Sequence, residues 1–284
     1  MIHNYALTPK QSKFFGAGLL LLPVAIIMLA FFLIPLLILG IQSLTGPTGF
    51  SLKHYIEIII HPLYRSSLWN SIWLSVATAL ASLIICMPIA FYLAESNADT
   101  IKTWLRAGFL FPLSFPGIVV GFMIILLFGH TGLFPYLTNL VMGKTHLDIA
   151  FRLSGLFLAY MYFEIPRTTA ILEGGVKQLD PKLEEAARSL GAGAWLTFYK
   201  ITLPRLYPAI LSTVTLCFAT AMGAFGTALT LARDFSVLPI AMYSQYTLFF
   251  NIGLASAMAI VLAIFTLMAL YVFQTVLLNE KEDN

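Results

Sequence analysis

The chain has 284 residues, of which 59% are hydrophobic and only 10% are charged, and its mean hydropathy is +0.88. Soluble domains carry roughly 25% charged residues, so this composition excludes an ordinary soluble protein and indicates a membrane protein. The net charge of +3 is small and spread along the chain, which argues against nucleic acid as a partner.

Six apolar stretches are each long enough to cross a bilayer as a helix, which takes about 20 residues. They cover residues 15–42, 68–94, 107–129, 152–173, 206–231 and 250–278. The first stretch is too long for a cleaved signal and has no Ala-x-Ala cleavage site, so it is predicted to be a retained span. The sequence therefore predicts an all-α membrane protein with six transmembrane helices.

Lysine and arginine are shared unevenly between the two sets of loops, and the richer side is expected to be cytoplasmic. Six spans put both termini on the same side as the loops at 95–106 and 174–205. That side carries Lys10, Lys13, Lys102, Arg106, Lys177, Lys182, Arg188, Lys200, Arg205 and Lys281. The other side carries Lys53, Arg65, Lys144, Arg152 and Arg233. We therefore expect the termini and the 174–205 loop in the cytoplasm.

Two charged residues, Glu164 and Arg167, fall well inside the fourth predicted span. Ionisable groups inside a membrane are costly and are functional candidates by default. In one interpretation they line the transport pathway or its gate. In the other they form a structural pair with each other at i, i+3, or lie near the cytoplasmic interface.

The polar 174–205 loop is predicted to form a helix, a glycine turn and a second short helix. Asp180 is a good N-cap, Pro181 suits the first helical position, and Gly191 is a natural helix stop. The predicted apolar face of the first helix consists of Leu183, Ala186, Ala187 and Leu190, and its polar face of Glu184, Glu185 and Arg188. The second helix carries Ala194, Trp195, Phe198 and Ile201 and is expected to close at Leu203-Pro204. Such a segment fits a partner's groove or a membrane surface.

The fifth predicted span is rich in small residues around Gly223, Phe225 and Gly226. Small residues let helices approach closely. These positions are candidates for a gate or a contact between two membrane subunits, and ordinary close packing is the alternative.

No catalytic or metal site is expected. Cys86 and Cys217 lie in apolar runs without partners at disulfide or zinc spacing, which indicates buried thiols. The five histidines show no metal-ligand spacing, and no nucleophile–base set is readable.

The order Glu185-Ala186-Ala187, Gly191, Ile201 and Leu203-Pro204 resembles the cytoplasmic coupling loop of the permease subunit of type I, binding-protein-dependent ABC importers. Leu172-Glu173, Leu179-Asp180-Pro181 and Ala224-Phe225-Gly226 are also similar to that family, so the resemblance covers roughly 68–276. It implies the type I permease fold, with an N-terminal tail, first helix and external loop over 1–67, the permease domain over 68–276, and a cytoplasmic tail over 277–284.

The resemblance also implies a function and partners. In the family the coupling loop docks into a separate ATPase subunit, and closure of two ATPases on ATP rocks a permease pair between inward-facing and outward-facing states. The residues expected at this interface are Leu183, Glu184, Glu185, Ala186, Ala187, Arg188, Leu190, Gly191, Ala192, Trp195, Phe198, Ile201, Leu203 and Pro204. ATP and magnesium are expected on the two partner ATP-binding subunits and no cofactor on this chain, which lacks the GxxxxGK[ST] phosphate loop.

The further expected partners are a second, identical or different permease subunit, membrane lipid and an extracytoplasmic solute-binding protein, in the bacterial inner membrane. By analogy with the family, the external loops at 130–151 and 232–249 would receive that binding protein. The candidate residues for this contact are His130, His146, Asp148, Arg233 and Asp234.

The local sequence around Gly223–Thr227 and Leu238-Pro239-Ile240 looks most like that of permeases for polyamines. Permeases for sulfate, molybdate, ferric iron, thiamine and aminophosphonate are nearly as similar. The expected function is ATP-driven import of such a solute. A self-sufficient secondary transporter is the competing function, and it should show repeated halves.

Overall fold

The structure is a computed structural model, and it describes residues 22–46, 49–94, 100–143 and 149–282. Almost all regular structure in these residues is helical. The elements after residue 28 are a π-helical turn at Leu29–Leu33, α2 Ile34–Ser43, β1 Thr45–Gly46, β2 Gly49–Phe50, α3 Lys53–Ile60, α4 Pro62–Ala94, α5 Thr100–Leu110, a 3-10 turn at Phe111–Ser114, α6 Gly117–Phe128, α7 Leu133–Met142, α8 Leu153–Val176, α9 Pro181–Ser189, α10 Ala194–Thr197, a π-helical turn at Phe198–Thr202, α11 Leu203–Met222, α12 Gly226–Leu231, α13 Leu238–Thr247 and α14 Ile252–Glu282.

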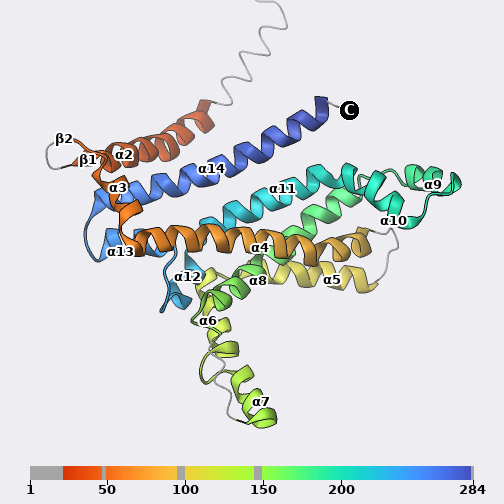
Figure 1. The fold of residues 1–284 in the computed structure, drawn as a ribbon, viewed down its shortest axis with the longest axis horizontal. Coiled ribbons are helices and arrows are strands. Elements are labelled where there is room, and N and C mark those ends of the chain that lie inside the picture. The colour runs from red at the N-terminus through yellow and green to blue at the C-terminus, as the bar shows by residue number, and fades with distance from the viewer. Residues whose placement is uncertain (1–21, 47–48, 95–99, 144–148, 283–284) are drawn as a thin grey trace, which may run out of the picture.

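Long helices make up a bundle in which α4 packs against both α8 and α11. The helix α14 lies beside α11, and α2 lies on the outer side of α14 (Figure 1). The short helix α9 and the C-terminal end of α14 lie at one end of the bundle, and α3 and α13 lie at the other. The α6–α7 arm projects sideways from the bundle (Figure 1).

Small hydroxyl side chains on α4 allow the central helices to approach closely. Ser71, Ser75, Thr78 and Ser82 are all buried, because they face α8, α11 and α13 rather than lipid. The hydroxyls of Ser75 and Thr78 each donate to the backbone carbonyl four residues earlier, at 2.7 Å. These two hydroxyls are therefore satisfied within their own helix, and small residues at the interface leave room for backbone approach.

Five described stretches are long and apolar enough to cross a membrane. They are Leu22–Ser43, Pro62–Ala94, Gly117–Val141, Ala194–Met222 and Ile252–Phe273. The predicted fourth span corresponds to α8, which has the required length but carries Glu164 and Arg167 and is therefore less apolar. An all-α membrane protein is confirmed, and the count of six spans stays a prediction.

The third and fifth predicted spans are not single helices, which corrects the sequence interpretation. The stretch 107–129 is broken between α5 and α6 at Phe111–Pro116, where Pro116 takes an extended conformation before α6. The residue before a proline is pushed away from helical geometry, and proline cannot donate a backbone hydrogen bond. The stretch 206–231 is likewise broken between α11 and α12, at Gly223–Phe225. Apolarity alone did not reveal either break.

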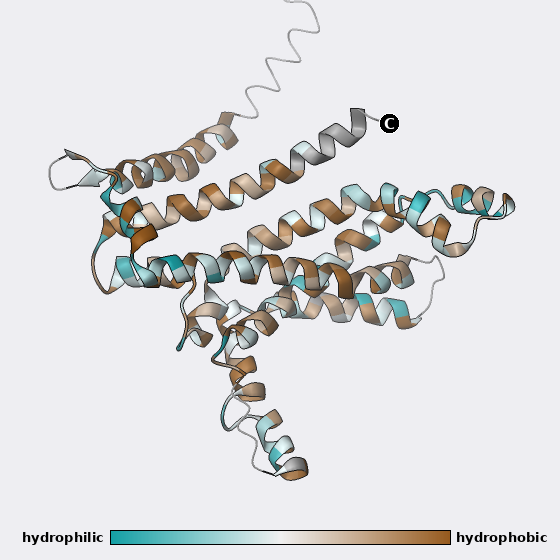
Figure 2. Cartoon of the chain, in the orientation of Figure 1, coloured by the Kyte–Doolittle hydropathy of each residue, from teal (hydrophilic) through white to brown (hydrophobic). Residues whose placement is uncertain are grey.

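Much of the apolar surface of the bundle is uncovered. Along the first described helix Phe31 is 80% exposed and Leu37 57% exposed. Figure 2 shows hydrophobic residues along the long helices, whereas hydrophilic residues gather around α9. An apolar belt around polar ends is the pattern expected of a multi-pass membrane protein.

Replacing either of two neighbouring glycines near the end of α8 by alanine is expected to change stability in opposite directions. A Cβ at Gly175 would come within 2.4 Å of the Ala209 side chain on α11, whereas a Cβ at Gly174 would meet nothing within 4 Å. We expect Gly175→Ala to destabilise the protein by about 1–3 kcal/mol through overpacking. We expect Gly174→Ala to stabilise it by up to about 1 kcal/mol, because alanine favours a helix over glycine. Thermal unfolding of the two purified variants distinguishes them, and equal shifts would contradict the α8–α11 contact.

Candidate functional site

The helix α9 begins and ends as its sequence predicts. The Asp180 carboxylate accepts a hydrogen bond from the Lys182 backbone N–H at 3.0 Å, and Pro181 occupies the first turn. Gly191 adopts a φ of +82°, and the N–H of Ala192 reaches back to the carbonyl of Ala187 at 3.0 Å. This left-handed glycine and its 6→1 bond form the expected helix stop.

The face that α9 turns inward differs from the predicted apolar face. Ala187 is buried and Leu183 half-buried, whereas Ala186 is exposed and Leu190 is 88% exposed. The Thr202 hydroxyl donates a hydrogen bond at 2.7 Å to a Glu184 carboxylate oxygen, so Glu184 of the predicted polar face also lies on the inward side. The helix is therefore rotated, and part of its apolar surface is presented to the outside.

The polar side of α9 is otherwise close to the prediction. The expected i, i+4 pair of Glu184 with Arg188 is present, with an N–O distance of 3.8 Å, and both side chains are partly exposed. Glu185 is exposed. Together with Ala186 and Leu190 it forms a small mixed surface at the tip of the bundle, which we call the α9 tip.

The second short helix does not close at Leu203-Pro204, which corrects the sequence interpretation. α10 continues through a π-helical turn at Phe198–Thr202 directly into α11, and the N–H of Leu203 bonds to the carbonyl of Phe198. The wider turn accommodates Pro204, which has no N–H for a bond within the helix. α10 and α11 are therefore joined without an intervening loop.

The predicted aromatic residues of this second helix have different environments. Trp195 is 77% exposed, whereas Phe198 is half-buried with its ring centroid 5.9 Å from that of Phe91 on α4. Ile201 and Ala192 are half-buried. Phe198 thus ties the segment to α4, and Trp195 stays available at its surface.

A cluster of charges lies beside this segment, where α8 ends. The Glu173 carboxylate oxygen Oε1 lies 2.8 and 2.9 Å from two nitrogens of Arg106 and 2.6 Å from Nζ of Lys177. Arg106 also donates to the backbone carbonyl of Leu93 at 2.7 Å. Sequence reasoning missed this cluster. The i, i+4 spacing of Glu173 and Lys177 was a readable signal, but Arg106 is 67 residues from Glu173.

Glu164 and Arg167 form the pair that their spacing predicts. Their side chains lie 2.9 Å apart, and the Thr220 hydroxyl of α11 donates to the same Glu164 oxygen at 2.7 Å. The Glu164 side chain is 4% exposed and that of Arg167 31% exposed. The second carboxylate oxygen of Glu164 is buried and has no hydrogen-bond partner among the described residues. The pairing is confirmed, and a pathway role stays a prediction.

The two glycines singled out in the fifth predicted span lie in different environments. A Cβ at Gly226 would lie 3.2 Å from the backbone nitrogen of Ile118, so Gly226 sits in a close crossing of α12 with α6. Gly223 and Phe225 instead line a cavity of about 460 Å³. The other lining residues are Leu39, Gln42, Pro239, Met242, Tyr243, Tyr246, Ile252, Ala255, Ser256, Ala259 and Leu262. This cavity lies between α2, α13 and α14.

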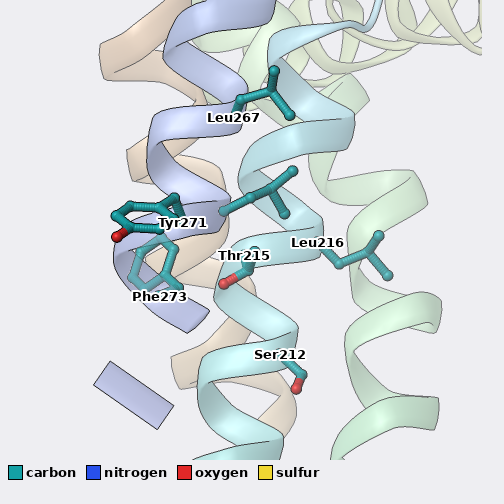
Figure 3. Close-up of a pocket in the computed structure, with 7 residues that line it drawn as sticks. Ser212, Thr215, Leu216, Leu267, Tyr271 and Phe273 are labelled. Atoms are coloured by element: carbon teal, nitrogen blue, oxygen red, sulfur yellow. The ribbon is translucent and has the colours of Figure 1, made fainter. Parts of the chain in front are cut away.

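A second hollow, of about 670 Å³, lies between α11 and α14 (Figure 3). Ser212, Thr215 and Leu216 line it from α11, and Leu267 and Tyr271 lie opposite on α14. The hydroxyls of Ser212 and Thr215 donate to carbonyls of their own helix, so the lining of the hollow is mainly apolar. No pattern in the sequence predicted this hollow.

The two predicted external loops meet at one aromatic ring. The His130 ring lies 5.8 Å from the Phe151 ring, and the Arg233 guanidinium lies over the same ring at 4.3 Å. Asp234 is exposed next to Arg233. The other two predicted loop residues, His146 and Asp148, lie outside the described residues. Each loop also contains a helix, α7 or α13, that the sequence interpretation did not include.

Cys86 and Cys217 are free thiols and are buried, as predicted. Among the described residues, no group of three or more His, Cys, Asp or Glu side chains is arranged to hold a metal ion.

The comparison with known families gives one match that covers most of the chain. The family described as "Binding-protein-dependent transport system inner membrane component" matches residues 86–280. This range contains α9, the Glu164–Arg167 pair and the charge cluster at Glu173.

Individual relatives carry several substrate names. The chain is 29% identical over 217 residues to the probable sulfate transport system permease protein cysT of Chlorella vulgaris, covering 69% of this chain and 80% of that protein. It is 30% identical over 182 residues to the molybdenum transport system permease protein ModB of Haemophilus influenzae, covering 62% and 78%. It is 26% identical to a putative ferric transport system permease protein of the same organism, covering 96% of this chain and 43% of that one.

Solved structures share the fold. One chain of a bacterial alginate ABC transporter, in complex with alginate pentasaccharide-bound periplasmic protein, matches with a TM-score of 0.78 and 15% identity, covering 92% of this chain and 93% of that chain. A chain of the inward-facing MetNI methionine ABC transporter matches with a TM-score of 0.60 and 15% identity, covering 77% and 95%.

Proposed function

We propose a function that starts from family membership, since this chain belongs to the binding-protein-dependent transport system inner membrane components, the permease subunits of type I ABC importers. In this proposal the chain forms, with a second permease subunit, the membrane pathway for a small solute delivered by an extracytoplasmic binding protein. Both termini lie in the cytoplasm. ATP and magnesium act on two separate ATP-binding subunits.

The α9 tip is the observation that supports docking of an ATPase subunit. It places Glu185, Ala186 and exposed Leu190 at the end of the bundle. A short turn joins α9 to α8, and the Gly191 turn joins it to α10, which runs on into α11. A short helix with an apolar anchor and small neighbours fits a groove on a partner. Because α9 is connected tightly on both sides, a force applied there reaches two long membrane helices.

The proposed substrate is a small inorganic oxyanion of the sulfate or molybdate kind. Relatives with sulfate and molybdenum in their names support this. Of the Glu164–Arg167 pair, the guanidinium is the accessible member, and a partly exposed cation in a span suits a passing anion. Ferric iron is the second candidate, because a relative that matches over 96% of this chain carries that name. The polyamine substrate expected from the local sequence has no support among these relatives.

The proposal predicts that an ATPase subunit co-purifies with the chain. It also predicts that the complex in proteoliposomes takes up solute only when Mg-ATP is present on the side of the membrane where α9 lies. Labelled sulfate, molybdate, ferric iron and spermidine are compared as probes in the presence of the binding protein. Calorimetry of that binding protein with the same four probes gives an independent ranking. Uptake driven by an ion gradient, by the purified chain alone, would refute the proposed function.

A further inference from the structure

One carboxylate at the end of α8 binds two cationic side chains from different places in the fold. Glu173 is 8% exposed, and its oxygen Oε1 contacts both Arg106 and Lys177 within 3 Å. Lys177 lies one turn further along the same helix, so its contact stays within α8. Arg106 comes from α5, so its contact joins two helices.

Arg106 reaches a third helix through its Nη2 atom. That nitrogen donates to the backbone carbonyl of Leu93 at 2.7 Å, in the last turn of α4. The last carbonyls of a helix have no partner within the helix and carry the negative end of its dipole, so a guanidinium suits them. One side chain therefore holds the ends of α4, α5 and α8 together.

The helix α5 depends on this contact more than its neighbours do. Of the α5 side chains that the structure describes, Lys102 alone is buried, and Arg106 and Phe109 are half-buried. By contrast, α4 and α8 are joined by an apolar cluster of Cys86, Ala90 and Leu172. Two cationic side chains thus replace the apolar packing that α5 lacks at this end of the bundle. Arg106 contacts Glu173 on α8, and the Lys102 ammonium lies 4.8 Å from the centroid of the Tyr92 ring on α4.

The cluster lies next to the segment that leads to α9. Only a tight turn separates Glu173 from Asp180, with backbone bonds from Lys177 to Glu173 and from Leu179 to Val176. Any displacement of α9 therefore acts first on the end of α8. The direct ionic contact from Glu173 to Arg106 carries that displacement from α8 to α5. α4 has further contacts of its own, with α8 through the apolar cluster and with Phe198 through Phe91.

We propose that Arg106 and Glu173 are positioning residues that make α5 move together with α8 when an ATPase subunit displaces α9. This inference rests on the proposed function. Neither residue touches solute or nucleotide in this proposal. Their role is mechanical, in that the contact transmits displacement from α8 to α5, whose described side chains are mostly exposed.

The test uses the whole complex with its ATPase subunit in nanodiscs and Mg-ATP with vanadate as the probe. Hydrogen–deuterium exchange is followed in two segments, 181–202 and 100–110. In the unaltered complex we expect trapping to change exchange in both segments. In Arg106→Gln and Glu173→Gln we expect the change in 181–202 to persist and the change in 100–110 to fall roughly fivefold or more, the range of typical coupling between sites.

Lys177→Gln is the matched control. It removes a cation from the same Glu173 oxygen, and its side chain is 50% exposed compared with 41% for Arg106, but it leaves the contact between helices in place. We expect Lys177→Gln to keep most of the response in 100–110. The double variant Arg106→Gln with Glu173→Gln should be no worse than either single variant, because both remove one contact.

The outcomes separate this inference from the proposed function. A full response of 100–110 in Arg106→Gln would overturn the inference, as would an equal loss in Lys177→Gln. If the unaltered chain binds no ATPase subunit, the proposed function fails, and the inference fails with it. Should Glu173→Gln not accumulate, Arg106→Gln tests the same contact from the more exposed side chain.

Discussion

Replacing Gly191 by valine is expected to release the ATPase subunit from the purified complex. Gly191 has a φ of +82°, a region that costs an ordinary L-residue roughly 1–2 kcal/mol and a β-branched residue more. The valine therefore drives the end of α9 out of its glycine stop and moves the adjacent Leu190. We expect the amount of co-purified ATPase subunit to fall by about tenfold or more, since each 1.4 kcal/mol is a factor of ten in affinity.

Gly193→Val is the matched control for this experiment. Both glycines have open space where a Cβ would be added, but Gly193 has a φ of −68° and a ψ of 155°, which valine adopts readily. The two variants add the same side chain two residues apart and differ mainly in backbone strain. Thermal unfolding of Gly193→Val should stay close to that of the unaltered protein, because its side chain does not enter the core and its backbone is unstrained. Gly191→Val should lose only the cost of its own backbone strain, roughly 1–2 kcal/mol or somewhat more. Full retention of the ATPase subunit by Gly191→Val would contradict docking through the α9 tip.

Local chemistry explains why α9 could be predicted in detail. The Asp180 cap, Pro181 in the first turn and Gly191 at the stop each act within a few residues, and each is where the sequence placed it. The rotation of α9 could not be predicted in the same way. It accompanies a hydrogen bond from Thr202 to Glu184, which joins residues that are 18 positions apart.

The breaks in two predicted spans show what hydropathy does not measure. An apolar stretch reports how well residues suit lipid, not whether their backbone stays helical. Pro112 and Pro116 were visible in the sequence, but prolines are tolerated in membrane helices when neighbours satisfy the backbone. At Gly223–Phe225 the sequence carries only small or apolar residues, and the break depends on how α12 packs across α6 at Gly226.

The charge cluster at Glu173 could not be predicted from the sequence for another reason. Arg106 lies in a cytoplasmic loop by sequence, and nothing local relates it to Glu173 or to the carbonyl of Leu93. Glu164 and Arg167, one turn apart on α8, were recognised because their spacing itself predicts the pair. Contacts within a helix are thus readable from sequence, whereas contacts between helices need the packing of α4, α5 and α8.

Removing the charge of Arg167 is expected to have two separable effects. Arg167→Ala leaves the Glu164 carboxylate buried with the Thr220 hydroxyl as its remaining partner. Breaking a buried pair from one side costs about 3–5 kcal/mol, because an uncompensated charge stays inside. We therefore expect Arg167→Ala to lower the thermal midpoint and the membrane abundance, and ATP-driven uptake of labelled sulfate or molybdate to fall more than abundance does.

The double variant Glu164→Gln with Arg167→Gln separates stability from transport. It removes both charges together, so no ion is left buried, and two amides one helical turn apart can still hydrogen-bond. We expect abundance and thermal midpoint to return close to those of the unaltered protein. If Arg167 guides an anion, uptake per molecule stays at least about tenfold lower, since a hydrogen bond to a charged group contributes roughly 1.5–3 kcal/mol.

The same double variant gives a different result if Glu164 and Arg167 are a purely structural pair. In that case the charges matter only to each other, and their joint removal restores uptake together with abundance. The exposed fractions favour the other result, since a pair that served packing alone would be covered on both sides, yet Arg167 is 31% exposed and Glu164 4%. A guanidinium that pairs with Glu164 through one nitrogen retains further N–H donors for a ligand. Restored uptake in the double variant would therefore remove the main structural argument for an anion pathway at Arg167.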